Sequence, residues 1–220
     1  MTNFIKLLAE KNKMISFTKE NGEVVAATVL NLYPHYFFDL TNKYDKEYMN
    51  LYLCSKSFSL RKNKLTKPIY CMFEKRHLLP MQKIIKSKVT STILKKLIKN
   101  NILQEKYNLL RFLRLDNLKC ESVDVIANTK GRGFTGTIKR FNFKQGPKTH
   151  GSKSYRRPGS IGAGTTPGRV LENKRMAGRS GNNRITIKNI QVLSKTKYTL
   201  IVKGPVPGTV GGDVFIVIKY

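Results

Sequence analysis

Alternating and β-branched positions near the start of the 220-residue chain predict a β-hairpin. Residues 14–18 and 24–33 have the composition of strands, with apolar positions recurring every second residue or in a short continuous run. The Lys19-Glu-Asn-Gly22 sequence between them favours a tight turn, because Asn-Gly readily adopts positive φ. A further strand is predicted at residues 48–54, with Pro68 and Pro80 as breakers on its C-terminal side.

The hydrophobic period changes at residues 81–103. Ile85, Val89, Ile93 and Leu97 recur every four residues, and the lysines of this segment lie mostly away from that stripe. A spacing of four is typical of one face of an α-helix, so the segment predicts an amphipathic, basic helix. We expect the helix to pack on a domain with its lysines toward solvent or RNA. The alternative is a helix that lies on a membrane surface.

Strand patterns return at residues 119–127 and again after residue 184. Ile190 and Val192 lie one residue out of phase with Ile185 and Ile187, so a β-bulge near Asn189 is expected. The last two strands, at residues 198–203 and 213–220, flank a loop rich in glycine and proline.

Early and late strands separated by a long excursion predict a mainly β fold with some α-helix. The expected architecture is a β-barrel domain with an amphipathic helical insertion and a long extended basic loop. Residues 1–127 would form the N-terminal part of the barrel, with the insertion at about 81–103. Residues 128–183 would form the extended loop, and residues 184–220 the strands that complete the barrel.

The charge is concentrated in that excursion. The chain has a formal net charge of +29, and residues 128–188 hold fifteen lysines or arginines against one acid, Glu172. The segment is flanked by strands, which favours an ordered extension over a disordered basic tail. Such a surface needs a polyanion nearby to offset its self-repulsion. No apolar run approaches the roughly 20 residues of a membrane helix, so no membrane insertion is expected.

The residue types in the basic segment fit RNA and not catalysis. It holds eight of the twelve arginines, whose planar guanidinium groups match phosphate and stack on bases. Further stacking surfaces come from its aromatic residues, Phe134, Phe141, Phe143 and Tyr155.

Nucleotide-binding and catalytic motifs fail on their context. Gly131-Arg-Gly-Phe-Thr-Gly136 matches a dinucleotide loop, but residues 137–143 are β-branched and aromatic and do not favour the helix that this loop requires. His150 and Glu172 have no nearby metal ligand or second carboxylate in the sequence. We therefore expect no enzyme activity, catalytic residue, metal site or small-molecule substrate, and Mg²⁺ only through bound RNA. A phosphate- or nucleotide-binding enzyme using the Gly131–Gly136 loop remains the alternative.

Several motifs in this chain resemble one family. They are Thr129-Lys-Gly-Arg-Gly-Phe-Thr-Gly-Thr-Ile-Lys-Arg-Phe-Asn-Phe143, Thr149-His-Gly151, Arg157-Pro-Gly-Ser-Ile-Gly162, Thr166-Pro-Gly-Arg169, Lys174-Arg-Met-Ala-Gly178 and Val202-Lys-Gly-Pro-Val-Pro-Gly208. Together they resemble the bacterial-type large-subunit ribosomal protein L three. The resemblance implies a β-barrel on the solvent side of the subunit and a loop threading through ribosomal RNA toward the peptidyl transferase centre. It also implies early binding in subunit assembly and no part in the chemistry of translation.

The resemblance and the charge pattern together assign candidate residues. The expected RNA-binding residues are Lys130, Arg132, Lys139, Arg140, Phe141, Lys144, Lys148, His150, Lys153, Arg156, Arg157, Arg169, Lys174, Arg175, Arg179 and Arg184. The expected loop tip near the peptidyl transferase centre is Ser160, Ile161, Gly162, Ala163, Gly164, Thr165 and Thr166. This tip lacks the glutamine that is common in the bacterial family, and Phe141 stands where tryptophan is usual.

The resemblance also implies the setting in which the chain works. The expected partners are large-subunit ribosomal RNA and neighbouring large-subunit proteins. The Lys-, Asn- and Ile-rich composition and the diverged middle region favour a mitochondrial ribosome, with a plastid or a bacterial cytoplasm as alternatives. A free-standing DNA- or RNA-binding protein is a third functional class.

Overall fold

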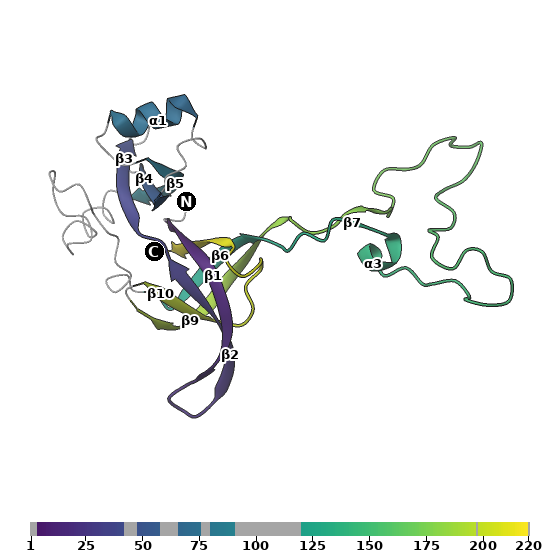
Figure 1. Cartoon of the computed structure of the whole chain (residues 1–220), viewed down its shortest axis with the longest axis horizontal. Helices are drawn as coiled ribbons and strands as arrows, with labels where there is room; N and C mark the ends of the chain where they lie inside the picture. The colour runs from purple at the N-terminus through teal and green to yellow at the C-terminus, as the bar shows by residue number, and fades with distance from the viewer. Residues whose placement is uncertain are drawn as a thin grey trace. The chain divides into compact units, whose positions relative to one another are not determined.

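The chain forms two compact units in a computed structural model that describes residues 4–41, 48–57, 66–75, 80–90, 120–196 and 198–219. We call residues 1–127 together with 184–220 the sheet unit, and residues 128–183 the loop unit. Figure 1 shows the elements of both units in chain order. Each unit is described separately.

The sheet unit is built almost entirely from strands. In chain order its elements are β1 (Phe4–Thr18), β2 (Val24–Leu32), β3 (His35–Thr41), β4 (Tyr48–Ser57), α1 (Lys67–Glu74), β5 (Met81–Thr90), β6 (Ser122–Asn128), β9 (Arg184–Lys195), β10 (Thr199–Lys203) and β11 (Asp213–Lys219). The loop unit holds β7 (Phe134–Thr135), α3 (Thr137–Phe141) and β8 (Gly178–Arg179). The predicted mainly β fold class is confirmed.

Strand pairing closes part of the sheet into a ring. The order is β11-β6-β9-β10-β2-β1-β5-β4-β3, and an additional pairing joins β11 to β1. Six strands therefore form a closed cycle of pairings, while β5, β4 and β3 continue outward from β1. The barrel geometry expected from the sequence stays a prediction beyond this cycle.

The core lies on the inner face of the ring. In the antiparallel pair of β1 and β11, Ile5 lies opposite Ile218 and Leu7 lies opposite Ile216. These four side chains are at most 2% exposed. Because strand side chains alternate between faces, this register places one set of aliphatic residues from each strand inside. Residues from β2, β4, β5, β6, β9 and β10 join the same cluster.

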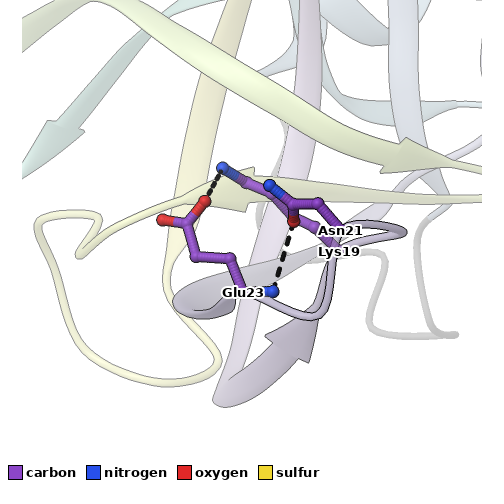
Figure 2. Close-up of polar contacts among 3 residues, drawn as sticks. All are labelled: Lys19, Asn21 and Glu23. Carbon is purple, nitrogen blue, oxygen red and sulfur yellow. Dashed lines mark hydrogen bonds and ion pairs between the residues drawn. The ribbon is translucent and has the colours of Figure 1, made fainter.

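The hairpin predicted at the start of the chain is present. β1 and β2 are joined by a turn in which Gly22 has φ of +80° and donates its N–H to the Lys19 carbonyl. The Lys19 ammonium lies 2.7 Å from the Glu23 carboxylate, and the Glu23 N–H donates to the Asn21 side chain (Figure 2). Strand β1 starts at Phe4, well before the predicted start at residue 14.

The bulge predicted near Asn189 has a clear structural counterpart. Asn189 has φ of +55°, and its N–H donates to the Asp124 carboxylate at 2.8 Å. Ile187 and Ile190 both pack with the core cluster although they are three residues apart, an odd spacing that places side chains on opposite faces of a regular strand. A left-handed residue within β9 thus shifts the phase of the strand.

The helix predicted at residues 81–103 is wrong where the structure describes it, because Met81–Thr90 is strand β5. A spacing of four residues is also two periods of a strand, so Ile85 and Val89 are both buried in either structure. The deciding residues lie between them: Ser87 is buried while Lys86 and Lys88 are exposed, which is strand alternation. Residues 91–103 lie outside the described part of the chain.

Two short helices were not predicted. α1 begins at Lys67 with Pro68 in its first turn, a position where proline is favoured because no backbone donor is lost. Phe73 of α1 packs edge-on against Phe38 of β3, with ring centroids 5.0 Å apart. α3 follows Gly136 directly, so residues 137–141 do start one helical turn, contrary to the sequence prediction for this segment.

Candidate nucleic-acid interface

The loop unit begins and ends in a two-stranded ribbon. Thr129 donates its N–H to the Asn183 carbonyl, Arg132 donates to Ser180, and Ser180 donates to Gly133, all at 2.9 Å. The ribbon continues into β7 and β8, where Phe134 lies opposite Arg179. These backbone bonds hold the two ends of the loop unit side by side without an apolar core.

Gly181 is required for this ribbon. Its φ is +77°, and a Cβ atom there would lie 2.0 Å from the Lys130 carbonyl oxygen. No side chain fits at that distance from a backbone oxygen, and positive φ further disfavours any other residue. The glycine thus permits close approach of the two backbones.

Arg140 on α3 braces the inner part of the loop unit. Its guanidinium donates to the Met176 carbonyl at 2.8 Å and lies 4.9 Å from the Phe141 ring centroid. A Cβ atom on Gly178 would lie 2.7 Å from Arg140 Nη1, so Gly178 leaves room for the guanidinium group. Arg140 was predicted to contact RNA, and the structure shows that part of its donor capacity already serves the protein.

Phe141 is already covered by cations. The Arg175 guanidinium lies 6.0 Å from its ring centroid, in addition to Arg140, and Phe143 lies 6.4 Å away at a tilted angle. Phe141 is half-buried, so the predicted stacking surface is shared with two arginines of the same unit. Phe134, by contrast, is 76% exposed and offers an open aromatic face.

The outer part of the loop unit is shaped by turns. Gly146 donates its N–H to the Tyr155 carbonyl at 3.1 Å, and the Lys148 ammonium lies 5.7 Å from the Tyr155 ring centroid. Between them His150 and Gly151 have φ of +59° and +72°, which reverses the chain. His150 is exposed there, and the described residues hold no group of three or more histidine, cysteine or acidic side chains that could bind a metal ion.

The predicted tip is fully exposed. Every residue from 156 to 175 has an exposed side chain. Local bonds order this stretch: the Ser160 hydroxyl donates to the Gly162 carbonyl at 3.2 Å, and Gly168 donates its N–H to Gly164 at 3.0 Å. The tip therefore presents small side chains and backbone groups to its surroundings.

Charge dominates the surface of the loop unit. Residues 128–183 contain thirteen lysines or arginines and one acid, a net +12. The only buried residues in this fully described range are Thr135 and Thr137. No ion pair forms within it, so these cations project into solvent without an anionic partner inside the loop unit.

Comparison with known proteins gives a consistent answer. The family model described as Ribosomal protein L3 matches residues 97–208. The large ribosomal subunit protein uL3c of Gracilaria tenuistipitata var. liui is 35% identical over 96% of this chain and 98% of its own length. The chain belongs to the ribosomal protein L3 family. The uL3 protein of Herpetosiphon aurantiacus is 36% identical over 96% of this chain and 94% of its own length.

Membership of the ribosomal protein L3 family excludes the enzyme among the functional classes. The family is structural and not enzymatic, so the chain is not an enzyme. The resemblance drawn from the glycine-rich motifs is confirmed. The similar proteins are uL3c proteins of plastid type, as in Gracilaria tenuistipitata var. liui and Guillardia theta, and bacterial uL3 proteins. They give no support to the expected mitochondrial location. No helix within the described residues has the length and apolar character needed to span a bilayer.

The structure brings most of the predicted site residues into the loop unit of this ribosomal protein L3 family member. All of them except Phe141 are exposed. Arg184 differs, because it belongs to the sheet unit, where its guanidinium lies 5.9 Å from the Phe215 ring centroid. Sequence reasoning missed the other cations around that ring, Lys6 and Lys83, because their strands are far apart in the chain.

Proposed function

We propose that this chain is a structural component of the large ribosomal subunit that binds large-subunit ribosomal RNA through its loop unit. The observation that carries the proposal is a net charge of +12 on 56 residues that bury only two threonines. A segment without an apolar core gains little from packing on itself, and its cations repel one another. Phosphate groups of RNA would supply both the opposing charge and the surface to pack against.

The backbone of the loop unit supports this role. The ribbon at its base and the turns at Gly146 and His150 fix a path for the chain before RNA is present. Arginines along this path would bind phosphate oxygens with two parallel hydrogen bonds, which lysine cannot do. Contacts of this kind position a protein and stabilise folded RNA, with little reading of base sequence.

The finer assignments follow the family resemblance. The tip, residues 160–166, would be directed toward the peptidyl transferase centre and would influence it without taking part in the chemistry. The chain would bind early in subunit assembly, with neighbouring large-subunit proteins as further partners. Mg²⁺ would be held only by the RNA. The ribosome would be of plastid or bacterial type, in line with the relatives; the mitochondrial location stays a prediction.

RNA binding as a function of salt tests the proposal. The full chain should bind a large-subunit ribosomal RNA transcript with an affinity that falls steeply between 50 and 200 mM salt. The double variant Arg156→Gln/Arg157→Gln should make the slope of log K against log salt less negative by about 1.4 to 1.8, at 0.7–0.9 per phosphate contact. Its matched control is Lys13→Gln/Lys203→Gln, which removes the same charge from exposed positions of the sheet unit. Salt-insensitive binding, or equal effects of the two variants, would contradict the proposal.

Sedimentation separates a ribosomal component from a free-standing nucleic-acid binder. The chain should sediment with the large subunit at moderate salt and be released by ribonuclease. Limited proteolysis adds a local readout, because residues 144–180 should be cleaved in the free chain and protected in the particle. A chain that stays at the top of the gradient would favour the free-standing binder.

A further inference from the structure

One aromatic ring of the sheet unit is approached by cations from three strands. The Lys6 ammonium on β1 lies 4.3 Å from the Phe215 ring centroid, the Lys83 ammonium on β5 lies 5.6 Å away, and the Arg184 guanidinium on β9 lies 5.9 Å away. Phe215 itself is on β11. We call these four residues the Phe215 cluster. All of them belong to the sheet unit, and Arg184 directly follows the last residue of the loop unit in the chain.

The cluster carries more positive charge than the described residues around it neutralise. Lys83 pairs with the Asp213 carboxylate. Within the described part of the chain, neither the Lys6 ammonium nor the Arg184 guanidinium forms an ion pair. Burial, and next the charge of Arg184, lowers the pKa of Lys6 below its usual value. Two like charges are thus held beside each other in a partly desolvated place, which is unfavourable until an anion joins them.

The backbone positions of Lys6 and Phe215 are fixed by the sheet. Lys6 lies opposite Val217 in the β1–β11 ladder, and Leu8 lies opposite Phe215. The Lys6 N–H also donates to the Ser87 hydroxyl of β5 at 3.0 Å. Because three strands meet here through backbone and side-chain bonds, Lys6 and Phe215 are pre-positioned before any ligand arrives. Pre-positioning lowers the entropy lost on binding.

We propose that the Phe215 cluster is a second RNA-contact site, in which Lys6 and Arg184 bind phosphate groups of an RNA backbone. Arg184 offers a planar pair of donors and Lys6 a point charge, and both suit phosphate oxygens. The Phe215 ring lies within cation–π distance of both cations and helps to hold them beside each other. The inference rests on the proposed RNA-binding function and adds to Arg184, already an expected RNA-binding residue, a contact by Lys6 beside the Phe215 ring, both of which lie outside the basic segment.

The test compares two double variants of the full chain on the same large-subunit ribosomal RNA transcript. In Lys6→Gln/Arg184→Gln, the slope of log K against log salt should become less negative by about 1.4 to 1.8, as for two lost phosphate contacts. Lys13→Gln/Lys203→Gln serves again as the control of equal charge, because both lysines are exposed on the sheet unit outside the cluster. A slope change no larger than that of the control overturns the proposal.

Thermal unfolding of the free chain at low salt shows whether a loss of RNA affinity in Lys6→Gln/Arg184→Gln comes only from a less stable fold. Removing the two crowded charges should raise the unfolding midpoint or leave it unchanged while RNA affinity falls. A midpoint that falls together with RNA affinity would mean that the cluster only supports the fold, and would overturn the proposal. Failure of the cluster is distinguishable from failure of the proposed function: in the first case Arg156→Gln/Arg157→Gln still weakens salt-sensitive binding, and in the second the unaltered chain shows none.

Discussion

The sheet unit and the loop unit reach order by different physical routes. In the sheet unit, strands from both ends of the chain place aliphatic side chains such as Leu7, Leu30 and Ile216 at 0–2% exposure. In the loop unit, by contrast, the two buried residues are Thr135 and Thr137, and order comes from backbone ladders and positive-φ turns. The first unit is held by removal of apolar surface from water; the second is held by hydrogen bonds that water also offers.

The difference means that the apolar stabilisation lies in the sheet unit, whereas much of the positive charge lies in the loop unit. Apolar burial gives the sheet unit a core of its own. The loop unit places thirteen cations on a path with little stabilisation of its own, and under the proposed function it gains stabilising free energy when it contacts RNA. Among the described residues of the sheet unit, the Phe215 cluster holds two cations without an ion pair beside one ring.

The largest expected contrast comes from the same substitution made in the two units. Leu7→Ala should lower the free energy of unfolding by about 2–5 kcal/mol, since it leaves a cavity at a fully packed position. Leu171→Ala should change it by less than about 0.5 kcal/mol, because Leu171 is 62% exposed. Denaturant unfolding followed by far-ultraviolet circular dichroism measures both. Equal losses would show that the loop unit has a packed core, and the comparison would fail.

A smaller effect is expected from pH and acts only on the sheet unit. His35 is 2% exposed and accepts the Leu8 N–H at Nε2 over 2.7 Å. Burial lowers the pKa of His35 to about 4, against an opposing backbone hydrogen bond to Tyr33. As the pH falls, His35 is therefore protonated in the unfolded chain at pH values at which it stays neutral in the folded chain. Stability should be complete above about pH 6.5 and decline by about 3 kcal/mol in total as the pH falls through 4.

Unfolding free energies measured from pH 7.5 to 4 would check this dependence. The variant His35→Gln keeps a hydrogen-bond acceptor but does not titrate, so this part of the pH dependence should disappear in it. A pH profile that is the same in His35→Gln and the unaltered chain would mean that His35 is not the group responsible.

The sequence predicted local structure correctly where a short pattern of residues had only one structural interpretation. Asn21-Gly22 produced the expected turn, and the phase change around Asn189 corresponds to a residue with φ of +55°. The period at residues 81–103 had two interpretations, because a repeat of four residues fits a helix and also every second position of a strand. Only the partners of β5, namely β4 and β1, decide between them, and a single sequence does not reveal strand partners.

The candidate site residues also fall into those that the sequence predicts and those that only the fold brings together. A run of cations along residues 130–179 is visible in the sequence because its members are close together. The Phe215 cluster is not, because Lys6 and Phe215 are brought together only by the pairing of the first strand with the last. The internal role of Arg140 was also hidden, since its acceptor, the Met176 carbonyl, lies across the loop unit.

The smallest effect tests whether the loop unit can be loosened without disturbing the sheet unit. In Gly181→Ala, the new Cβ would meet the Lys130 carbonyl at 2.0 Å in a residue with φ of +77°. The conformation alone should cost about 1–2 kcal/mol, and the contact would push the two backbones of the ribbon apart. Hydrogen exchange at the Arg132 and Ser180 amides should then quicken by roughly tenfold, since 1.4 kcal/mol corresponds to a factor of ten. Global unfolding should be unchanged, because the sheet unit keeps its core.

Gly162→Ala is the matched control: nothing lies within 4 Å of the added Cβ, so exchange should stay as it is. If Gly181→Ala instead lowered the global unfolding free energy as much as Leu7→Ala does, the two units would share one cooperative transition, and their order could no longer be assigned to separate causes.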